Sequence, residues 1–231
     1  MKVLLGSVVP EHRRHSVLPA LDYEFALVQS VLANPKRWMR HRAGWLLLDN
    51  GAHENGTPAT DDQIIDAAMI CRPDAIIAPD YLGQSSDTIR RFSLFMKRLN
   101  ERLVEELYGV KIYYVAQCAV GAVLHDRVFR EYPKTQLALP FRIRQADWFE
   151  DLDAINSFRN RDIHLLGLRS HEDLLNIARW SQSPWYSRFV TLDTTKIFHV
   201  RNMRERLNWR SVHDTRVNVF ENIAFLRKAL Q

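Results

Sequence analysis

The sequence predicts an α/β protein, a (β/α)8 barrel of the TIM type, and two observations carry that prediction. Short apolar segments alternate along the 231 residues with segments whose apolar residues recur at helical spacing. Most of the short segments are apolar throughout, which is typical of parallel strands covered by helices. Strands alternating with helices imply right-handed βαβ units. A doubly wound open sheet is the alternative, although no GxGxxG follows the first strand.

Seven strands are expected in order, at residues 2–9, 45–50, 75–80, 111–118, 135–141, 163–168 and 188–194. An eighth would fall at about 207–217, where the pattern is poor, so an irregular last strand stays open. Helices are expected at residues 18–33, 61–71, 84–107, 120–131, 146–159, 171–181 and 218–230. The second helix is expected to begin at an acidic cap, Asp61-Asp62. Gly109 follows the third, where a C-terminal capping glycine belongs.

The composition limits the class of protein. Apolar residues make up 46% and charged residues 26%, as in globular proteins, which excludes disordered, collagen-like and coiled-coil chains. No apolar run approaches the roughly 18 residues of a membrane span, and the N-terminus is interpreted as a strand rather than a signal peptide. With only Cys71 and Cys118, and no metal-type histidine spacing, we expect no disulfide framework, metal, zinc subdomain or cofactor. We therefore expect one domain, residues 1–231, in a reducing cytoplasm.

The charge balance permits a nucleic-acid partner without establishing one. Lys and Arg total 32 against 27 Asp and Glu, a net charge of +5. Basic residues follow several strand ends and are densest at residues 196–206. The candidates for phosphate contacts are Arg142, Arg169, Lys196, Arg201 and Arg204. The alternative is an ordinary solvated basic surface.

Polar residues recur at the carboxyl ends of the predicted strands. These residues are Asp49, Asn50, Asp80, Gln117, Gly167 and Asp193. In a barrel these ends converge on one pocket, and buried carboxylates are costly unless they are paired. The pattern therefore predicts an active site with carboxylates at its centre.

Each of these residues also has a structural interpretation. Asp49-Asn50-Gly51 is a good hairpin turn, although no antiparallel strand follows it. Asp80 could cap the next helix, but Ser85 or Ser86 is the better cap candidate. Gln117 could satisfy backbone groups at a strand end, and Asp193 could begin a turn.

In their order along the chain, Asp49-Asn50-Gly51-Ala52, Asp80, Gln117, Gly167-Leu168 and Asp193 resemble the motifs of the guanine transglycosylase family. Members of that family are (β/α)8 enzymes that exchange guanine in nucleic acid for a 7-deazaguanine base. The motifs are short, and the resemblance spans nearly the whole chain.

The resemblance implies a role for each matched residue. Asp193 is the expected nucleophile, and Asp49 the expected general acid and base. Asp80 is expected to bind the donor edge of guanine. The other expected base-contacting residues are Asn50, His53, Gln117, Gly167 and Leu168.

The sequence departs from the family pattern at several positions. Asn50 and Ala52 replace a serine and a glycine, and His53 replaces a base-stacking phenylalanine. Cys118-Ala119 replaces paired glycines, and no zinc ligands follow Asp193, unlike in the tRNA enzymes of the family. The zinc-free pattern is similar to phage and bacterial relatives that modify DNA.

The resemblance therefore implies a glycosyltransferase (a pentosyltransferase) that inserts a 7-deazaguanine into DNA, in the bacterial host cytoplasm if the chain is phage-encoded. The expected partners are DNA, guanine and a 7-deazaguanine base, with no membrane. Three alternatives stay open: exchange on tRNA, a non-catalytic base- or nucleic-acid-binding subunit, and a nucleosidase acting on small molecules.

Overall fold

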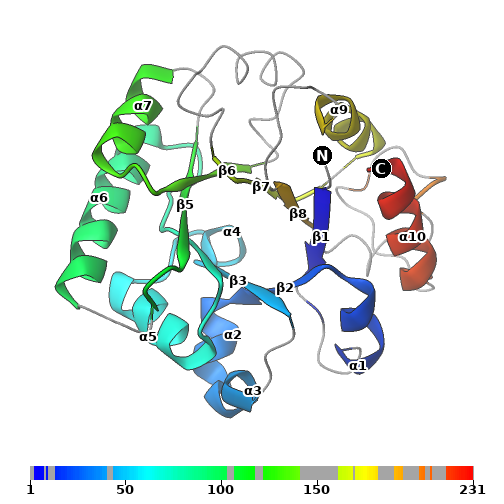
Figure 1. Ribbon diagram of the computed structural model, residues 1–231, viewed down its shortest axis with the longest axis horizontal. Coiled ribbons are helices and arrows are strands. Elements are labelled where there is room, and N and C mark those ends of the chain that lie inside the picture. Colours follow the sequence, from blue (N-terminus) through cyan, green and yellow to red (C-terminus); the bar gives the residue numbers. More distant parts are fainter. Residues whose placement is uncertain are drawn as a thin grey trace. The chain divides into compact units, whose positions relative to one another are not determined.

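The computed structural model has a closed barrel of eight strands in the order β1 to β8, which confirms the predicted (β/α)8 fold (Figure 1). It describes residues 3–7, 9, 14–40, 44–102, 107–117, 122–140, 161–168, 170–181, 190–194, 203–205, 209 and 217–230. The strands are β1 (Val3–Ser7), β2 (Tyr23–Leu27), β3 (Trp45–Asp49), β4 (Ala75–Ile77), β5 (Lys111–Val115), β6 (Gln136–Pro140), β7 (Ile163–Leu166) and β8 (Val190–Asp193).

Helices follow most of the strands. The described helices are α1 (Arg14–Val17), the 3-10 helix η2 (Leu18–Ala20), α2 (Val28–Ala33), α3 (Pro35–Arg40), α4 (Ala52–Asn55), α5 (Asp61–Cys71), α6 (Ser85–Glu101), α7 (Ala122–Glu131), α9 (His171–Ser181) and α10 (Val219–Ala229). Two units can be distinguished: unit 1 contains Met1–Glu24 and Pro140–Gln231, and unit 2 contains Phe25–Leu139.

In unit 1, β1 pairs in parallel with the next strand along the chain, β2, and with the distant strand β8. Gly6 of β1 is the register partner of both Tyr23 and Asp193. β8 in turn pairs with β7, with Leu165 beside Leu192. Both leucines are fully buried. This pairing sets Asp193 at the carboxyl end of β8.

The predicted helix at residues 18–33 is wrong in its middle, because Tyr23–Leu27 forms strand β2. Asp22 explains the change. Its N–H donates to the carbonyl of Leu5 at 2.8 Å, and its carboxylate accepts the Leu5 N–H at 2.9 Å. These long-range bonds align the chain with β1 at the point where helical spacing alone favours a helix.

β2 is also the strand that the sequence interpretation lacked. With it, the barrel has eight strands up to Asp193, whereas the sequence placed the eighth at about 207–217. Most of that stretch, and all of the predicted helix at 146–159, lie outside the described residues.

In unit 2, β3 to β6 pair in parallel along consecutive strands. Helices α5, α6 and α7 lie on the outer side of these strands (Figure 1). α5 begins with a capping box, in which Thr60 accepts from the Gln63 N–H and Gln63 returns a bond to the Thr60 N–H. The cap predicted at Asp61 and Asp62 is therefore wrong: Thr60 is the N-cap, and both aspartates lie in the first turn of the helix.

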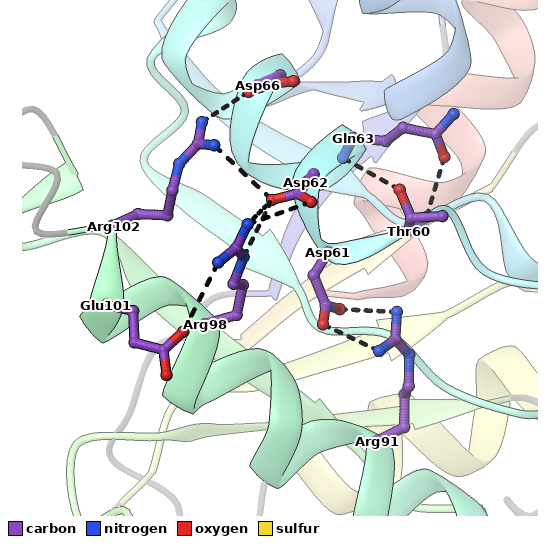
Figure 2. Close-up of polar contacts among 9 residues, drawn as sticks. All are labelled: Thr60, Asp61, Asp62, Gln63, Asp66, Arg91, Arg98, Glu101 and Arg102. Carbon is purple, nitrogen blue, oxygen red and sulfur yellow. Dashed lines mark hydrogen bonds and ion pairs between the residues drawn. The ribbon is translucent and has the colours of Figure 1, made fainter.

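Two arginines of α6, together with Arg102 at its C-cap, pair with three aspartates of α5 (Figure 2). The pairs are Arg91–Asp61 at 2.8 Å, Arg98–Asp62 at 3.0 Å and Arg102–Asp66 at 2.9 Å. The Asp61 pair is the most buried, and desolvation raises the pKa of Asp61 above its ordinary value while Arg91 opposes the rise. These arginines hold two helices together.

The cap predicted for the next helix is wrong. α6 starts at Ser85, but its N-cap is Gln84, without a side-chain cap bond. The Thr88 hydroxyl instead accepts the Tyr81 N–H at 2.9 Å and contacts the Tyr81 carbonyl at 3.2 Å. This closed turn fixes where the helix begins, so neither Ser85 nor Ser86 is needed as a cap.

Candidate active site

Three polar side chains follow three neighbouring strands of unit 2, and two of them bind the third. Asn50 follows β3, Asp80 follows β4 and Gln117 follows β5. All three are buried. Asn50 Nδ2 donates to Asp80 Oδ1 at 2.8 Å, and Gln117 Nε2 donates to Asp80 Oδ2. We call Asn50, Asp80 and Gln117 the amide–carboxylate cluster.

The orientation of both amides is fixed by the backbone. Asn50 Oδ1 accepts the Ala52 N–H at 2.7 Å, and Gln117 Oε1 accepts the Gly83 N–H at 2.7 Å. With each oxygen pinned, each amide must present its NH2 group to the carboxylate. Each oxygen of Asp80 thus accepts from one of the two amides, which orient the carboxylate.

This arrangement tests the structural interpretations of Asp80 as a helix cap and of Gln117 as a partner of backbone groups. Asp80 does not cap α6, because its oxygens accept from the two amides. Gln117 does satisfy a backbone N–H, as that interpretation supposed, and it orients Asp80 as well. Its second amide N–H is a further donor at the same place.

Asp49 ends β3 and is followed directly by a helix. Asp49 Oδ2 accepts the Gly51 N–H at 3.2 Å, and the Asp49 side chain is buried. Gly51 has a φ of 75° and caps α4, so the segment does not form a hairpin turn. This left-handed conformation favours glycine, because a residue with a Cβ adopts it at a cost.

His53, the predicted base-stacking residue, lies on α4 with an exposed side chain. The short helix places it within one turn of Asn50 and Gly51. It makes none of the hydrogen bonds that build the amide–carboxylate cluster.

In unit 1, Asp193 closes β8 with its carboxylate held by the neighbouring strand. Asp193 Oδ1 accepts the Gly167 N–H at 2.8 Å, and the side chain is 15% exposed. Gly167 adopts a φ of 70°, which turns its N–H toward the carboxylate. Leu168 contributes its carbonyl to the Thr194 hydroxyl at 3.3 Å. The Gly167 N–H, which we expected to contact a base, therefore binds Asp193.

Two buried polar residues beside Asp193 were missed by the sequence analysis. His164 of β7 and Thr191 of β8 are fully buried, and His164 Nδ1 lies 2.8 Å from Thr191 Oγ1. His164 Nε2 lies 3.5 Å from Asp193 Oδ1. Each residue lies within an apolar strand. The one feature of the sequence that could have indicated either residue is that it is polar among apolar neighbours.

Of the five predicted phosphate-binding residues, the structure describes Arg204 alone, which is exposed in a turn at residues 203–205. Arg142, Arg169, Lys196 and Arg201 lie outside the described residues. Within the described part of the chain, no three His, Cys, Asp or Glu side chains gather as metal ligands do. No described helix combines the length and the apolar character that crossing a bilayer requires.

Comparison with known proteins supports the fold and goes no further. No family model matches this chain, and no curated protein matches it. D-psicose 3-epimerase from Clostridium cellulolyticum H10 is similar in structure, with 11% identity, a TM-score of 0.58 and 100% of both chains covered. Phosphoribosyl anthranilate isomerase from Thermotoga maritima has 11% identity and a TM-score of 0.54, with 99% of this chain and 100% of that chain covered.

Proposed function

We propose that this protein is an enzyme that exchanges guanine in DNA for a 7-deazaguanine derivative, through a covalent bond between Asp193 and the sugar. The observation that carries the proposal is the amide–carboxylate cluster, in which two pinned amides orient the buried Asp80 carboxylate. The similarity of the barrel to TIM-barrel enzymes fits an enzymatic role.

The proposed ligand of the cluster is the Watson–Crick edge of guanine. Guanine presents the N1–H and the N2 amine as adjacent donors beside the O6 acceptor. A carboxylate has about four acceptor positions, and the two amides of the cluster use two of them. Asp80 would accept both guanine donors, and the second amide N–H of Gln117 would donate to O6.

The same chemistry rejects adenine. The corresponding edge of adenine places an acceptor where guanine has the N1–H, and that acceptor would face the Asp80 carboxylate. A buried hydrogen-bonding group left unpaired costs about 1–3 kcal/mol, so one mismatch gives about 5- to 150-fold discrimination.

The proposed reaction conserves atoms and charge in two displacements. Asp193 Oδ2 attacks C1′ of the deoxyribose, the C1′–N9 bond breaks, and Asp49 gives its proton to the departing guanine. The incoming 7-deazaguanine then loses a proton to Asp49 and attacks C1′, and the Asp193–C1′ bond breaks. Both steps pass through oxocarbenium-like states that a carboxylate stabilises.

DNA is the proposed nucleic acid, and the target base must leave the duplex to reach these side chains. Flipping a base costs a few kcal/mol, which contacts between basic residues and phosphates would offset. Activity that depends on phosphate contacts falls steeply as salt increases, whereas release of a base from a free nucleoside does not.

The test is incorporation of labelled guanine into duplex DNA, single-stranded DNA and tRNA by the purified protein. Asp193→Ala removes the nucleophile, and Asp66→Ala is its matched control because Asp66 belongs to an exposed ion pair on α5. Incorporation into DNA that is lost in Asp193→Ala and kept in Asp66→Ala supports the proposal. A gel-stable protein–DNA adduct that needs Asp193 would identify the intermediate.

Other outcomes distinguish the alternatives. Incorporation into tRNA alone refutes DNA as the substrate and keeps the chemistry. Release of guanine from free nucleosides, without salt dependence, indicates a nucleosidase. Guanine binding without exchange on any substrate, with or without added 7-deazaguanines, indicates a binding subunit and refutes the proposed enzyme.

A further inference from the structure

A buried histidine stands beside the proposed nucleophile, and no role has been assigned to it. We propose that His164 is a positioning residue, set by Thr191, that holds one oxygen of Asp193 so that the other oxygen is presented to the sugar. This inference rests on the proposed function, because it concerns how the Asp193 carboxylate is held for attack.

The strand register brings the three side chains together. His164 of β7 and Thr191 of β8 are direct register partners. Thr191 and Asp193 are two residues apart on one strand, so they point to the same face of the barrel wall. His164 therefore reaches Thr191 with one ring nitrogen, at 2.8 Å, and approaches Asp193 with the other, at 3.5 Å.

The neighbours of the ring select its tautomer. A neutral imidazole has one N–H donor and one acceptor nitrogen. If Nδ1 carried the hydrogen, the Nε2 lone pair would face Asp193 Oδ1, and two acceptors would repel each other. If the Thr191 hydroxyl donates to Nδ1, then Nε2–H points at the carboxylate. The geometry therefore favours the Nε2–H tautomer, with Thr191 as the donor.

Both contacts fall on the same carboxylate oxygen. Asp193 Oδ1 accepts the Gly167 N–H at 2.8 Å and has His164 Nε2 at 3.5 Å. Both groups lie against Oδ1, which assigns the attack to Oδ2. The contact of 3.5 Å is longer than a hydrogen bond, and catalytic contacts of this kind shorten when substrate binds.

Donors on Oδ1 also assist the second displacement. When the Asp193–C1′ bond breaks, negative charge returns to the carboxylate and is shared by Oδ1. An N–H group already directed at that oxygen stabilises this charge without reorganisation. His164 and Thr191 therefore act on both halves of the reaction. Loss of their contact should lower kcat more than it changes KM.

Aromatic packing holds the imidazole in place. Tyr23 of β2 meets the His164 ring edge-on, with ring centroids 6.4 Å apart and planes at 74°. The Tyr23 ring lies directly over Gly6, where a Cβ would come within 2.2 Å of its Cζ atom. Gly6 thus makes room for the ring that packs against His164.

The kinetic test uses Thr191→Val, which keeps the shape of the side chain and removes the hydroxyl donor. We expect a loss of kcat of tenfold or more, corresponding to at least about 1.4 kcal/mol, with KM for DNA within threefold. Thr191→Ser restores the hydroxyl and should recover most of the rate. His164→Gln, which can still donate from its amide, should retain more activity than His164→Phe.

Thermal unfolding of each variant shows whether it is folded at the assay temperature. If wild-type protein exchanges bases in an Asp193-dependent way but Thr191→Val and His164→Phe keep kcat within twofold, the positioning role is refuted and the function stands. Equal losses in the Ser and Val variants would also refute it, because the hydroxyl would then be irrelevant.

A second measurement does not depend on activity. Nitrogen-15 NMR of labelled histidine in wild-type protein should give His164 the Nε2–H tautomer, and Thr191→Val should change that signal. An Nδ1–H tautomer in wild-type protein would overturn the inference. If no exchange is found on any substrate, the proposed function fails by itself, and the NMR result still decides how His164 is held.

Discussion

Replacing Asp80 by asparagine tests both the build of the amide–carboxylate cluster and its proposed ligand. In the wild type, each Asp80 oxygen accepts one amide donor, and both amides are pinned by backbone N–H groups. Asparagine replaces one oxygen with an NH2 group. That group must then face the NH2 group of either Asn50 or Gln117, so two donors meet. Neither amide can turn to relieve the conflict, because each would lose its own backbone bond.

The expected loss of stability follows from the hydrogen bond that the substitution removes. A hydrogen bond to a charged group contributes about 1.5–3 kcal/mol, and Asp80 is only 4% exposed, so solvent cannot replace it. We expect the free energy of unfolding to fall by about that amount, measured by urea denaturation followed by tryptophan fluorescence. Asp66→Asn is the control, because its exposed ion pair should contribute at most about 1 kcal/mol.

The same substitution bears on guanine binding. One donor of guanine would meet the new NH2 group, and a mismatch of about 1–3 kcal/mol weakens binding about 5- to 150-fold by titration calorimetry. An Asp80→Asn protein as stable as Asp66→Asn would refute the structural reasoning. Unchanged guanine affinity in a folded Asp80→Asn protein would refute the assignment of the base to this carboxylate.

Three further predictions concern conformation, packing and pH. Gly51→Ala and Gly56→Ala should each lower the free energy of unfolding by about 1–2 kcal/mol in urea denaturation, because both glycines are left-handed and the exposed Gln29 side chain near Gly51 can move aside. Gly6→Ala should destabilise the protein by about 1–3 kcal/mol and disturb the Tyr23 ring, visible in its NMR signals, because the new Cβ overlaps that ring. The raised pKa of Asp61 means that the folded state binds its proton more tightly than the unfolded state, so this group lowers stability as pH rises from 3.8 through the folded pKa. Asp61→Asn should lack that slope, and an identical pH profile for both proteins would contradict it.

The sequence predicted the barrel because a strand buried on both faces leaves a continuous apolar run. Seven strands were recognised, most of them as such runs, and five of the predicted helices agree in position with described helices. β2 escaped because Tyr23–Leu27 adjoins residues with helical spacing. Its strand character comes from Asp22 binding Leu5, a contact that no local pattern displays.

Only part of the candidate site was predicted, because long-range contacts leave no local pattern in the sequence. Asp49, Asp80, Gln117 and Asp193 could be found because a polar residue directly after a buried run is unusual. His164 and Thr191 could not, because each lies within a strand and gains meaning only from its partner on the neighbouring strand.

The fold class and the carboxylates and amides at the strand ends could be predicted from the sequence, because burial and periodicity are local properties of the chain. The contacts among those groups could not, since they join residues far apart in the sequence: Asn50 and Gln117 lie 30 and 37 residues from the Asp80 that they orient. Likewise, Gly167 lies 26 residues from the Asp193 that it holds. Hydrogen bonds are short and directional, so partners on separate strands are settled by strand register, which forms only when the sheet assembles.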